Sequence, residues 1–113
     1  MITIKEKNIE MSKGDSEALH IHALNDETFN DGDIIKFTVK RNVNETEGVI
    51  EKSVTVVGNN TTDVLINLTK DDTDLEIGNY VYDIRIVNGS VCTTPYKYKR
   101  FSIIATVGDN NGL

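Results

Sequence analysis

The stretch from Leu68 to Val87, LTKDDTDLEIGNYVYDIRIV, constrains the fold more than any other part of the chain. Its first half is polar and carries the residue types of a turn. Its second half alternates, with one side formed by Tyr80, Tyr82, Ile84 and Ile86. Alternation with a period of two is typical of a strand that buries one face. The stretch therefore predicts a corner at which the chain passes from one β-sheet to another.

The polar half of this stretch also carries the signals of a helix start. Thr69 and Asp72 have the spacing of a capping box, and the aspartates around them place negative charge near a first helical turn. Gly78 stands where such a turn needs a left-handed residue, and Leu75 and Ile77 are expected to tuck beneath it. We therefore predict a brief turn of helix that ends at Gly78, before the strand begins.

The spacing of Leu75, Gly78 and Tyr80 resembles the tyrosine corner of immunoglobulin-like sandwiches. In that feature, a tyrosine hydroxyl near the start of a late strand donates a hydrogen bond to the backbone of the connection before it. We expect Tyr80 to make such a bond.

Period-two alternation recurs along the chain, and no segment shows an amphipathic pattern of helical length. One or two short strands are expected within residues 2–11, followed by strands at Glu17–Ala23, Ile34–Arg41, Val49–Val57, Asp63–Leu68, Tyr80–Val87, Ser90–Thr93 and Tyr98–Val107. Asn88-Gly89 predicts a type I′ hairpin turn. Pro95 cannot donate to a strand ladder, so it predicts an edge or a bulge before the last strand.

This series of about seven to nine short strands predicts an all-β fold, an immunoglobulin-like two-sheet antiparallel β-sandwich. A small closed barrel would bury alternate residues in the same way and remains the competing architecture. Residues 1–107 are expected to form the sandwich and residues 108–113 a flexible tail or linker stub. Phe29, the lone aromatic residue of the polar segment 25–33, is expected to anchor that loop.

The inward-facing residues of all strands should form one core between the two sheets. The expected members are Phe37, Val39, Val54, Val56, Val64, Ile66, Tyr80, Ile84, Phe101 and Ile103. If this register is right, changing Ile84 to alanine should cost about 2–5 kcal/mol of stability.

The composition limits how the fold can be stabilised and which partners the chain can bind. The chain has 113 residues, a single cysteine and a formal net charge of −6. One cysteine excludes an internal disulfide, so packing alone must hold the fold. The negative charge repels nucleic acid and anionic membranes, and proteins or cations remain as partners. The sequence MITIKEKNIE lacks the apolar core of an export signal, and we expect folding in the cytoplasm.

Candidate metal ligands form two groups. His20 and His22 share one face of a predicted strand, as metal-binding histidine pairs do, but the sequence shows no third ligand. The acidic run beginning at Asp71 has Ile77 where a calcium loop that starts at Asp72 needs glycine, which favours a capping role. We therefore expect no metal site and no cofactor, and neither Zn²⁺ nor Ca²⁺ should stabilise the domain.

Enzymatic activity is not expected. No serine lies in a nucleophile-elbow motif, and both histidines fall within a predicted regular strand. Catalytic and cofactor-binding residues are therefore not assigned.

One run of residues interleaves aromatic rings with positive charge in a way that suits a binding surface. Its members are Pro95, Tyr96, Lys97, Tyr98, Lys99 and Arg100. Lysines on an edge strand also guard against aggregation, which is the other interpretation. We predict an exposed edge here, and a possible interaction surface formed by Pro95, Tyr96, Tyr98, Lys99 and Arg100.

The order of several short motifs resembles the immunoglobulin-like N-terminal domain of phage baseplate upper proteins and related prophage tail proteins. The motifs are Lys13-Gly14-Asp15 before an alternating strand, GDIIKFTVK from Gly32, LT…L..G.Y.YDI from Leu68, and Arg100-Phe101-Ser102-Ile103 near the end. The resemblance covers nearly all of residues 9–107. It implies a virion structural module, and it carries over no catalytic residue.

Two functions from different classes follow. The first is a phage or prophage tail or baseplate component that assembles in the host cytoplasm and associates with itself or with other virion proteins. The second is a bacterial cell-surface adhesion module that binds glycan or protein. The absence of a recognisable export signal favours the first, and neither function involves nucleic acid or a membrane.

Overall fold

The computed structural model describes residues 4–5, 8–23 and 26–105, and for residues 4–5 and 95–98 it describes the backbone only. The strands are β1 (Ile4–Lys5), β2 (Ile9–Ser12), β3 (Glu17–Ala23), β4 (Ile34–Lys40), β5 (Ile50–Thr55), β6 (Asp63–Leu68), β7 (Gly78–Asn88) and β8 (Val91–Ile104). No helix occurs among the described residues. The all-β prediction is therefore confirmed.

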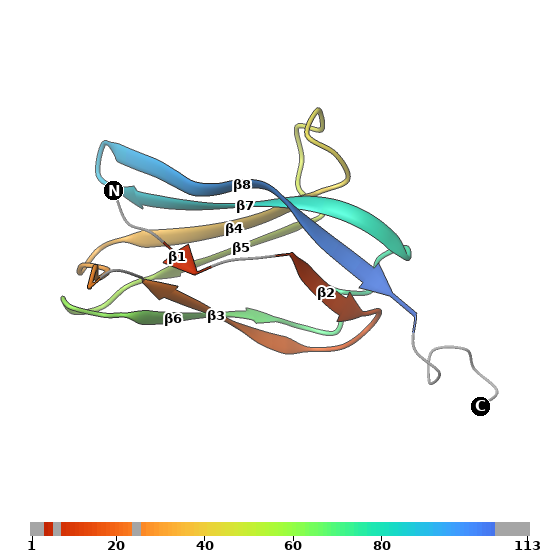
Figure 1. Ribbon diagram of the computed structural model, residues 1–113, viewed down its shortest axis with the longest axis horizontal. Coiled ribbons are helices and arrows are strands. Elements are labelled where there is room, and N and C mark those ends of the chain that lie inside the picture. The colour runs from red at the N-terminus through yellow and green to blue at the C-terminus, as the bar shows by residue number, and fades with distance from the viewer. Residues whose placement is uncertain (1–3, 6–7, 24–25, 106–113) are drawn as a thin grey trace.

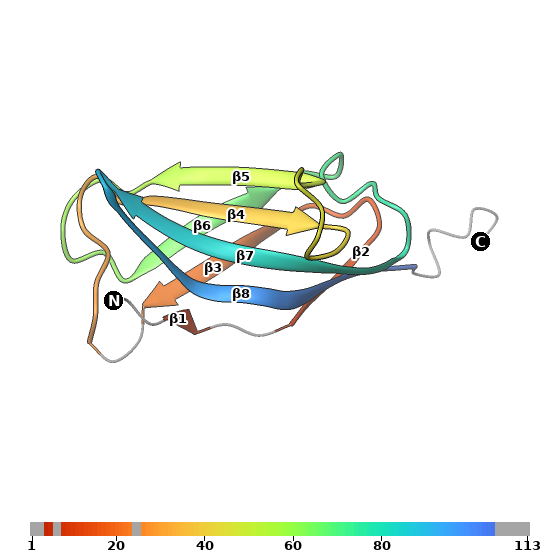
Figure 2. The ribbon, with the colours of Figure 1, turned by 90° about the horizontal axis from the view of Figure 1, so that it is seen from above.

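The strands form two sheets that face each other, as Figures 1 and 2 show. One sheet has the order β1-β3-β6 and the other the order β2-β8-β7-β4-β5. Immunoglobulin-like sandwiches divide their strands in the same way, with the second and fifth major strands in one sheet and the third, sixth and seventh in the other. The corner around residues 69–77 carries the chain from β6 in the first sheet to β7 in the second, as predicted.

One pair of strands corrects the antiparallel prediction. β2 lies parallel to β8, with Ile9 opposite Phe101 and Ser12 opposite Ile104. The other pairs are antiparallel. The chain leaves β1 in the three-stranded sheet and enters β2 in the five-stranded sheet. Alternation of side chains does not encode strand direction, so this pairing could not be predicted from periodicity.

The predicted core is present between the sheets. Nine of its ten members are buried, and Val54 is half-buried and packs against them. The core also contains Met11, Ile21, Phe29, Ile35, Ile50, Leu68, Tyr82 and Ile86. This burial confirms which side chains of the main strands were predicted to point into the core.

The β7–β8 hairpin differs from its prediction. Asn88 pairs with Val91, so the two-residue loop is Gly89-Ser90 rather than Asn88-Gly89. Gly89 has a φ of 59°, and Asn88 lacks the positive φ that a type I′ turn would require there. The Asn88 side chain instead donates a hydrogen bond of 2.7 Å to Asp33 Oδ1, which holds Asn88 as the last residue of the strand.

The last two predicted strands are one continuous strand, β8, which ends at Ile104 rather than at Val107. The irregularity expected at Pro95 takes the form of two register shifts, one between the pairs of Tyr82 and Ile84 and one between those of Ile84 and Ile86. A bulge lets a strand absorb extra residues without ending. Residues 106–113, which include the predicted tail, lie outside the described part of the chain.

The corner has the predicted hydrogen bonds, but the predicted turn of helix is absent. The backbone N–H of Thr69 donates to Asp72 Oδ2 (2.8 Å) and the N–H of Asp72 donates to Thr69 Oγ1 (3.2 Å), which is the predicted capping box. It closes a single turn without a helix. Gly78 does not end this turn; it opens β7 with a φ of 155°. Ile77 is 56% exposed and does not tuck beneath the turn.

The tyrosine corner is present. The hydroxyl of Tyr80 donates a 2.6 Å hydrogen bond to the carbonyl oxygen of Glu76, in the connection that precedes β7. The ring of Tyr80 is buried, so this bond ties the corner to the core.

The turn at residues 13–15 packs against this corner. Lys13 Nζ donates to the carbonyl of Leu75 (2.9 Å), and Gly14 N–H donates to the carbonyl of Thr73 (3.2 Å). The buried hydroxyl of Thr73 donates to the carbonyl of Asp15. Two of the motifs that carry the family resemblance, about 60 residues apart in the sequence, therefore form one structural unit.

Candidate functional site

A groove opens where the two sheets separate between β2 and β3. β1 pairs with β3 only at His22 and Ala23, and β2 pairs with β8 in the other sheet. No described strand covers the side of β3 that faces β2 over Glu17–Ile21. The cavity between them has a volume of about 510 Å³. We call it the β2–β3 groove.

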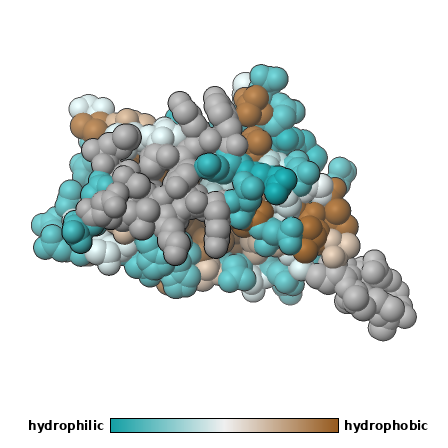
Figure 3. All heavy atoms as spheres, in the orientation of Figure 1, coloured by the Kyte–Doolittle hydropathy of each residue, from teal (hydrophilic) through white to brown (hydrophobic). Residues whose placement is uncertain are grey.

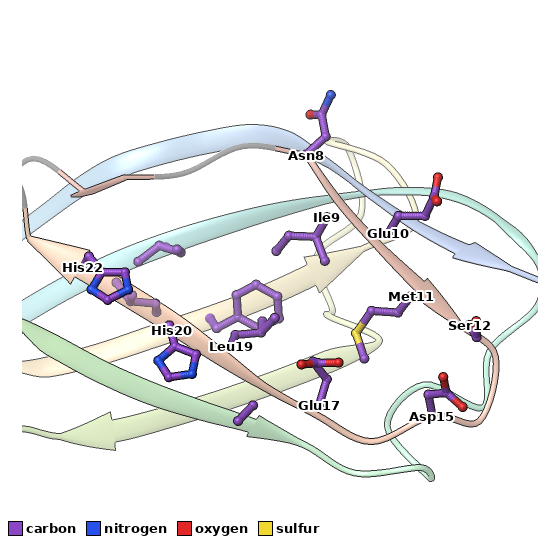
Figure 4. Close-up of a pocket in the computed structure, with 14 residues that line it drawn as sticks. Asn8, Ile9, Glu10, Met11, Ser12, Asp15, Glu17, Leu19, His20 and His22 are labelled. Atoms are coloured by element: carbon purple, nitrogen blue, oxygen red, sulfur yellow. The ribbon is translucent and has the colours of Figure 1, made fainter.

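The β2–β3 groove has an apolar floor and an acidic rim. The floor is formed by Ile9, Met11, Leu19, Ile21, Phe37 and Ile84. Figure 4 shows Ile9 and Met11 extending from β2 towards β3, where Glu17 lies below Met11. Glu10, Asp15 and Glu17 are exposed along the lining. In Figure 3, polar residues cover most of the described surface of this face, and apolar side chains are visible near the end of β8.

A cluster of two histidines and one aspartate borders the groove, because His20 and His22 are part of its lining. His20 and His22 extend side by side from β3 (Figure 4), with nearly parallel rings whose centroids are 5.9 Å apart. Asp63, the first residue of β6, is the direct cross-strand partner of His22. Its Oδ2 lies 3.2 Å from His20 Nδ1 and its Oδ1 lies 3.3 Å from His22 Nδ1. The sequence-based premise that the histidine pair lacks a third ligand is therefore wrong.

The predicted interaction surface lies on β8. β7 pairs with β8 on one side. On the other side, β2 accompanies β8 only from Phe101 to Ile104, and no described strand continues along that side of the earlier part of β8. Lys99 is half-buried, Arg100 is exposed, and the Arg100 N–H donates to Asn8 Oδ1 (3.2 Å). The side chains of Pro95, Tyr96, Lys97 and Tyr98 lie outside the described residues.

No protein-family model matches this sequence, and no curated protein matches it. Among the described residues, no helix is long and apolar enough to cross a membrane.

The acidic turn forms the predicted cap. Asp72 accepts the Thr69 bond and lies 2.9 Å from the ammonium group of Lys52 on β5, with its side chain 19% exposed. Burial tends to raise the pKa of Asp72, but the hydrogen bonds from Lys52 and Thr69 outweigh it and hold that pKa below its ordinary value. The turn is thereby attached to the opposite sheet.

This ion pair predicts a pH dependence of stability. Because the folded-state pKa of Asp72 is lowered, its charged form contributes stability above the unfolded pKa of about 3.9 and loses it as the pH falls through the folded pKa. Asp72→Asn should cost about 0.5–1.5 kcal/mol at neutral pH, and the difference from the native chain should vanish in strong acid.

Urea unfolding at a series of pH values measures that difference. Asp71→Asn, a change at the exposed neighbour, is the matched control and should leave stability within about 0.5 kcal/mol of the native chain. A gap between the native chain and Asp72→Asn that stays constant down to strongly acid pH would show that the charge of Asp72 contributes nothing.

Sequence reasoning missed two elements of this region. The β2–β3 groove depends on β1 and β2 belonging to different sheets, which alternation does not reveal. The role of Asp63 depends on the register of β3 against β6, residues more than 40 positions apart. The only available signal was that Asp63 begins a strand in which Val64, Ile66 and Leu68 alternate towards the core, which places Asp63 on the outer face.

Proposed function

We propose that this chain is a non-enzymatic structural module of a phage or prophage virion, in the tail or baseplate, and that it acts by binding other virion proteins. The observation that carries the proposal is the β2–β3 groove, an apolar channel bordered by the uncovered side of β3. The order of motifs that resembles the baseplate family supports the virion context.

The groove suits an extended peptide segment. The uncovered side of β3 offers backbone N–H and C=O groups to an added strand, and the apolar floor offers contacts for alternate side chains of that strand. The exposed carboxylates of Glu10, Asp15 and Glu17 favour lysine or arginine at the ends of the segment. The partner is therefore an alternating apolar strand with basic flanks, supplied by another virion protein.

The edge of β8 is a second proposed contact. Its predicted surface, Pro95 to Arg100, lies on the part of β8 that β2 does not accompany. Virion proteins repeat around an axis, so contacts that are weak singly gain strength through multiplicity.

Pull-down with the products of neighbouring genes tests the proposal, with light scattering to detect self-association. Leu19→Arg, which places a charge in the groove, should abolish capture of the partner. Leu65→Arg on the exposed face of β6 is the matched control and should leave capture unchanged. Binding should weaken with added salt, because exposed carboxylates contribute to it.

Three outcomes would change the proposal in different ways. Equal capture by both arginine variants would exclude the groove. Self-association without any captured product would indicate a homo-oligomer. A strict monomer that binds no neighbouring gene product but is retained on immobilised cell-wall glycan would favour the adhesion module.

A further inference from the structure

We propose that His20, His22 and Asp63 bind one Zn²⁺ ion per chain. The proposal is independent of the virion function, because it depends only on the outer face of β3 and β6. It replaces the sequence-based expectation of no metal site, whose premise was the missing third ligand.

Strand geometry brings the three side chains together. His20 and His22 are two residues apart on β3, so both face outward from the sandwich. Asp63 stands directly opposite His22 on the neighbouring antiparallel strand, and His20 is the diagonal neighbour. Regular backbone on two paired strands therefore fixes the three Cα positions before any ion binds.

The distances are close to those of a zinc site. Zn²⁺ binds histidine nitrogen and carboxylate oxygen at about 2.0–2.2 Å, so neighbouring ligand atoms around a tetrahedral ion lie about 3.3–3.5 Å apart. The two Nδ1–carboxylate distances are 3.2 and 3.3 Å. One ligand atom from each of the three residues lies within 4.8 Å of the others. The two histidines approach different oxygens of Asp63, so zinc binding requires the exposed side chains to rotate and close the remaining gap.

The chemistry of the cluster selects the metal. Two imidazoles and one carboxylate match the borderline preference of Zn²⁺, whereas Ca²⁺ and Mg²⁺ require mainly oxygen ligands. The carboxylate also offsets part of the ion's charge. The side chains of His20, His22 and Asp63 are 57%, 50% and 38% exposed, so an ion can reach them and keeps a position for water or a fourth ligand.

In the absence of metal, His20 and His22 contact Asp63 directly, and this arrangement competes with zinc binding. Zinc binds the deprotonated nitrogen of imidazole, so protons compete with zinc for the same ligand atoms. Zinc affinity should therefore fall as the pH is lowered.

Calorimetric titration of ZnCl₂ into the untagged chain is the test. A Cys92→Ser background removes the exposed thiol as a rival ligand. We expect saturation at one ion per chain, and a loss of affinity of at least about tenfold in each of His20→Ala, His22→Ala and Asp63→Asn. Asp71→Asn, at an exposed carboxylate in the corner, is the matched control and should not change the affinity.

Imidazole ¹⁵N NMR provides a second readout that does not depend on the variants. Stoichiometric zinc should shift the ring nitrogens of both histidines together. The absence of saturable binding at neutral pH, or equal affinity in Asp63→Asn and Asp71→Asn, would overturn the proposal. Perturbation of only one histidine would also overturn it.

Discussion

Ile84→Ala is expected to lower the free energy of unfolding by about 2–5 kcal/mol. Ile84 lies in the central strand β7, is 1% exposed, and stands opposite Phe37 on β4. Truncation removes buried apolar surface and leaves a cavity next to the floor of the β2–β3 groove. Neighbouring side chains that relax into this space would bring the loss towards the lower end of the range.

Urea unfolding of the variant and the native chain measures this loss. Ile77→Ala is the matched control, because it makes the same chemical change at a residue that is 56% exposed. The control should lose less than about 0.5 kcal/mol. An equally small loss for Ile84→Ala would mean that the inward face of β7 is assigned incorrectly.

Phe29→Ala is expected to cost about 3–5 kcal/mol and to loosen the loop before β4. Phe29 is fully buried although it lies outside the main strands. Its N–H donates to the carbonyl of Thr61 (2.7 Å), and the N–H of Thr61 donates back (3.2 Å). These backbone bonds join the loop before β4 to the loop before β6, and the buried ring holds the joined loops against the core.

Hydrogen exchange distinguishes local loosening from general loss of stability. The amide of Gly32 donates to the carbonyl of Val56. In Phe29→Ala this amide should exchange faster than the variant's loss of global unfolding free energy alone would explain. Asn30→Ala, at the exposed next position, is the control and should leave both stability and exchange near native values. If Phe29→Ala had the stability of the native chain, the ring would contribute little despite its burial.

The sequence predicted those features of the fold that depend on neighbouring residues. Alternation located the inward face of each main strand, as at Phe37 and Val39, because side-chain direction along a strand is a local property. The capping box of Thr69 and Asp72 and the Tyr80 hydrogen bond were also local, since they join residues three or four apart.

Features that depend on distant pairing could not be predicted. Alternation cannot show that β2 joins the sheet of β8 or runs parallel to it, and the groove is a consequence of that change of sheet. The hairpin loop lies one residue later in the sequence than predicted, and Asn88, the last residue of β7, bonds to Asp33, 55 positions earlier. The sequence does not reveal that Asp63 joins the histidine cluster for the same reason: its neighbours in space come from another strand.

The parallel pair of β2 and β8 has a mechanical consequence. Ile9 begins one strand of the pair and Ile104 ends the other, so these two points lie at opposite ends of the same ladder. Tension applied between them acts along the strands and loads every bond of the ladder together. In an antiparallel hairpin pulled at its open end, the bonds would instead break one after another. The sandwich is therefore closed by the pairing geometry best suited to carrying load along the chain.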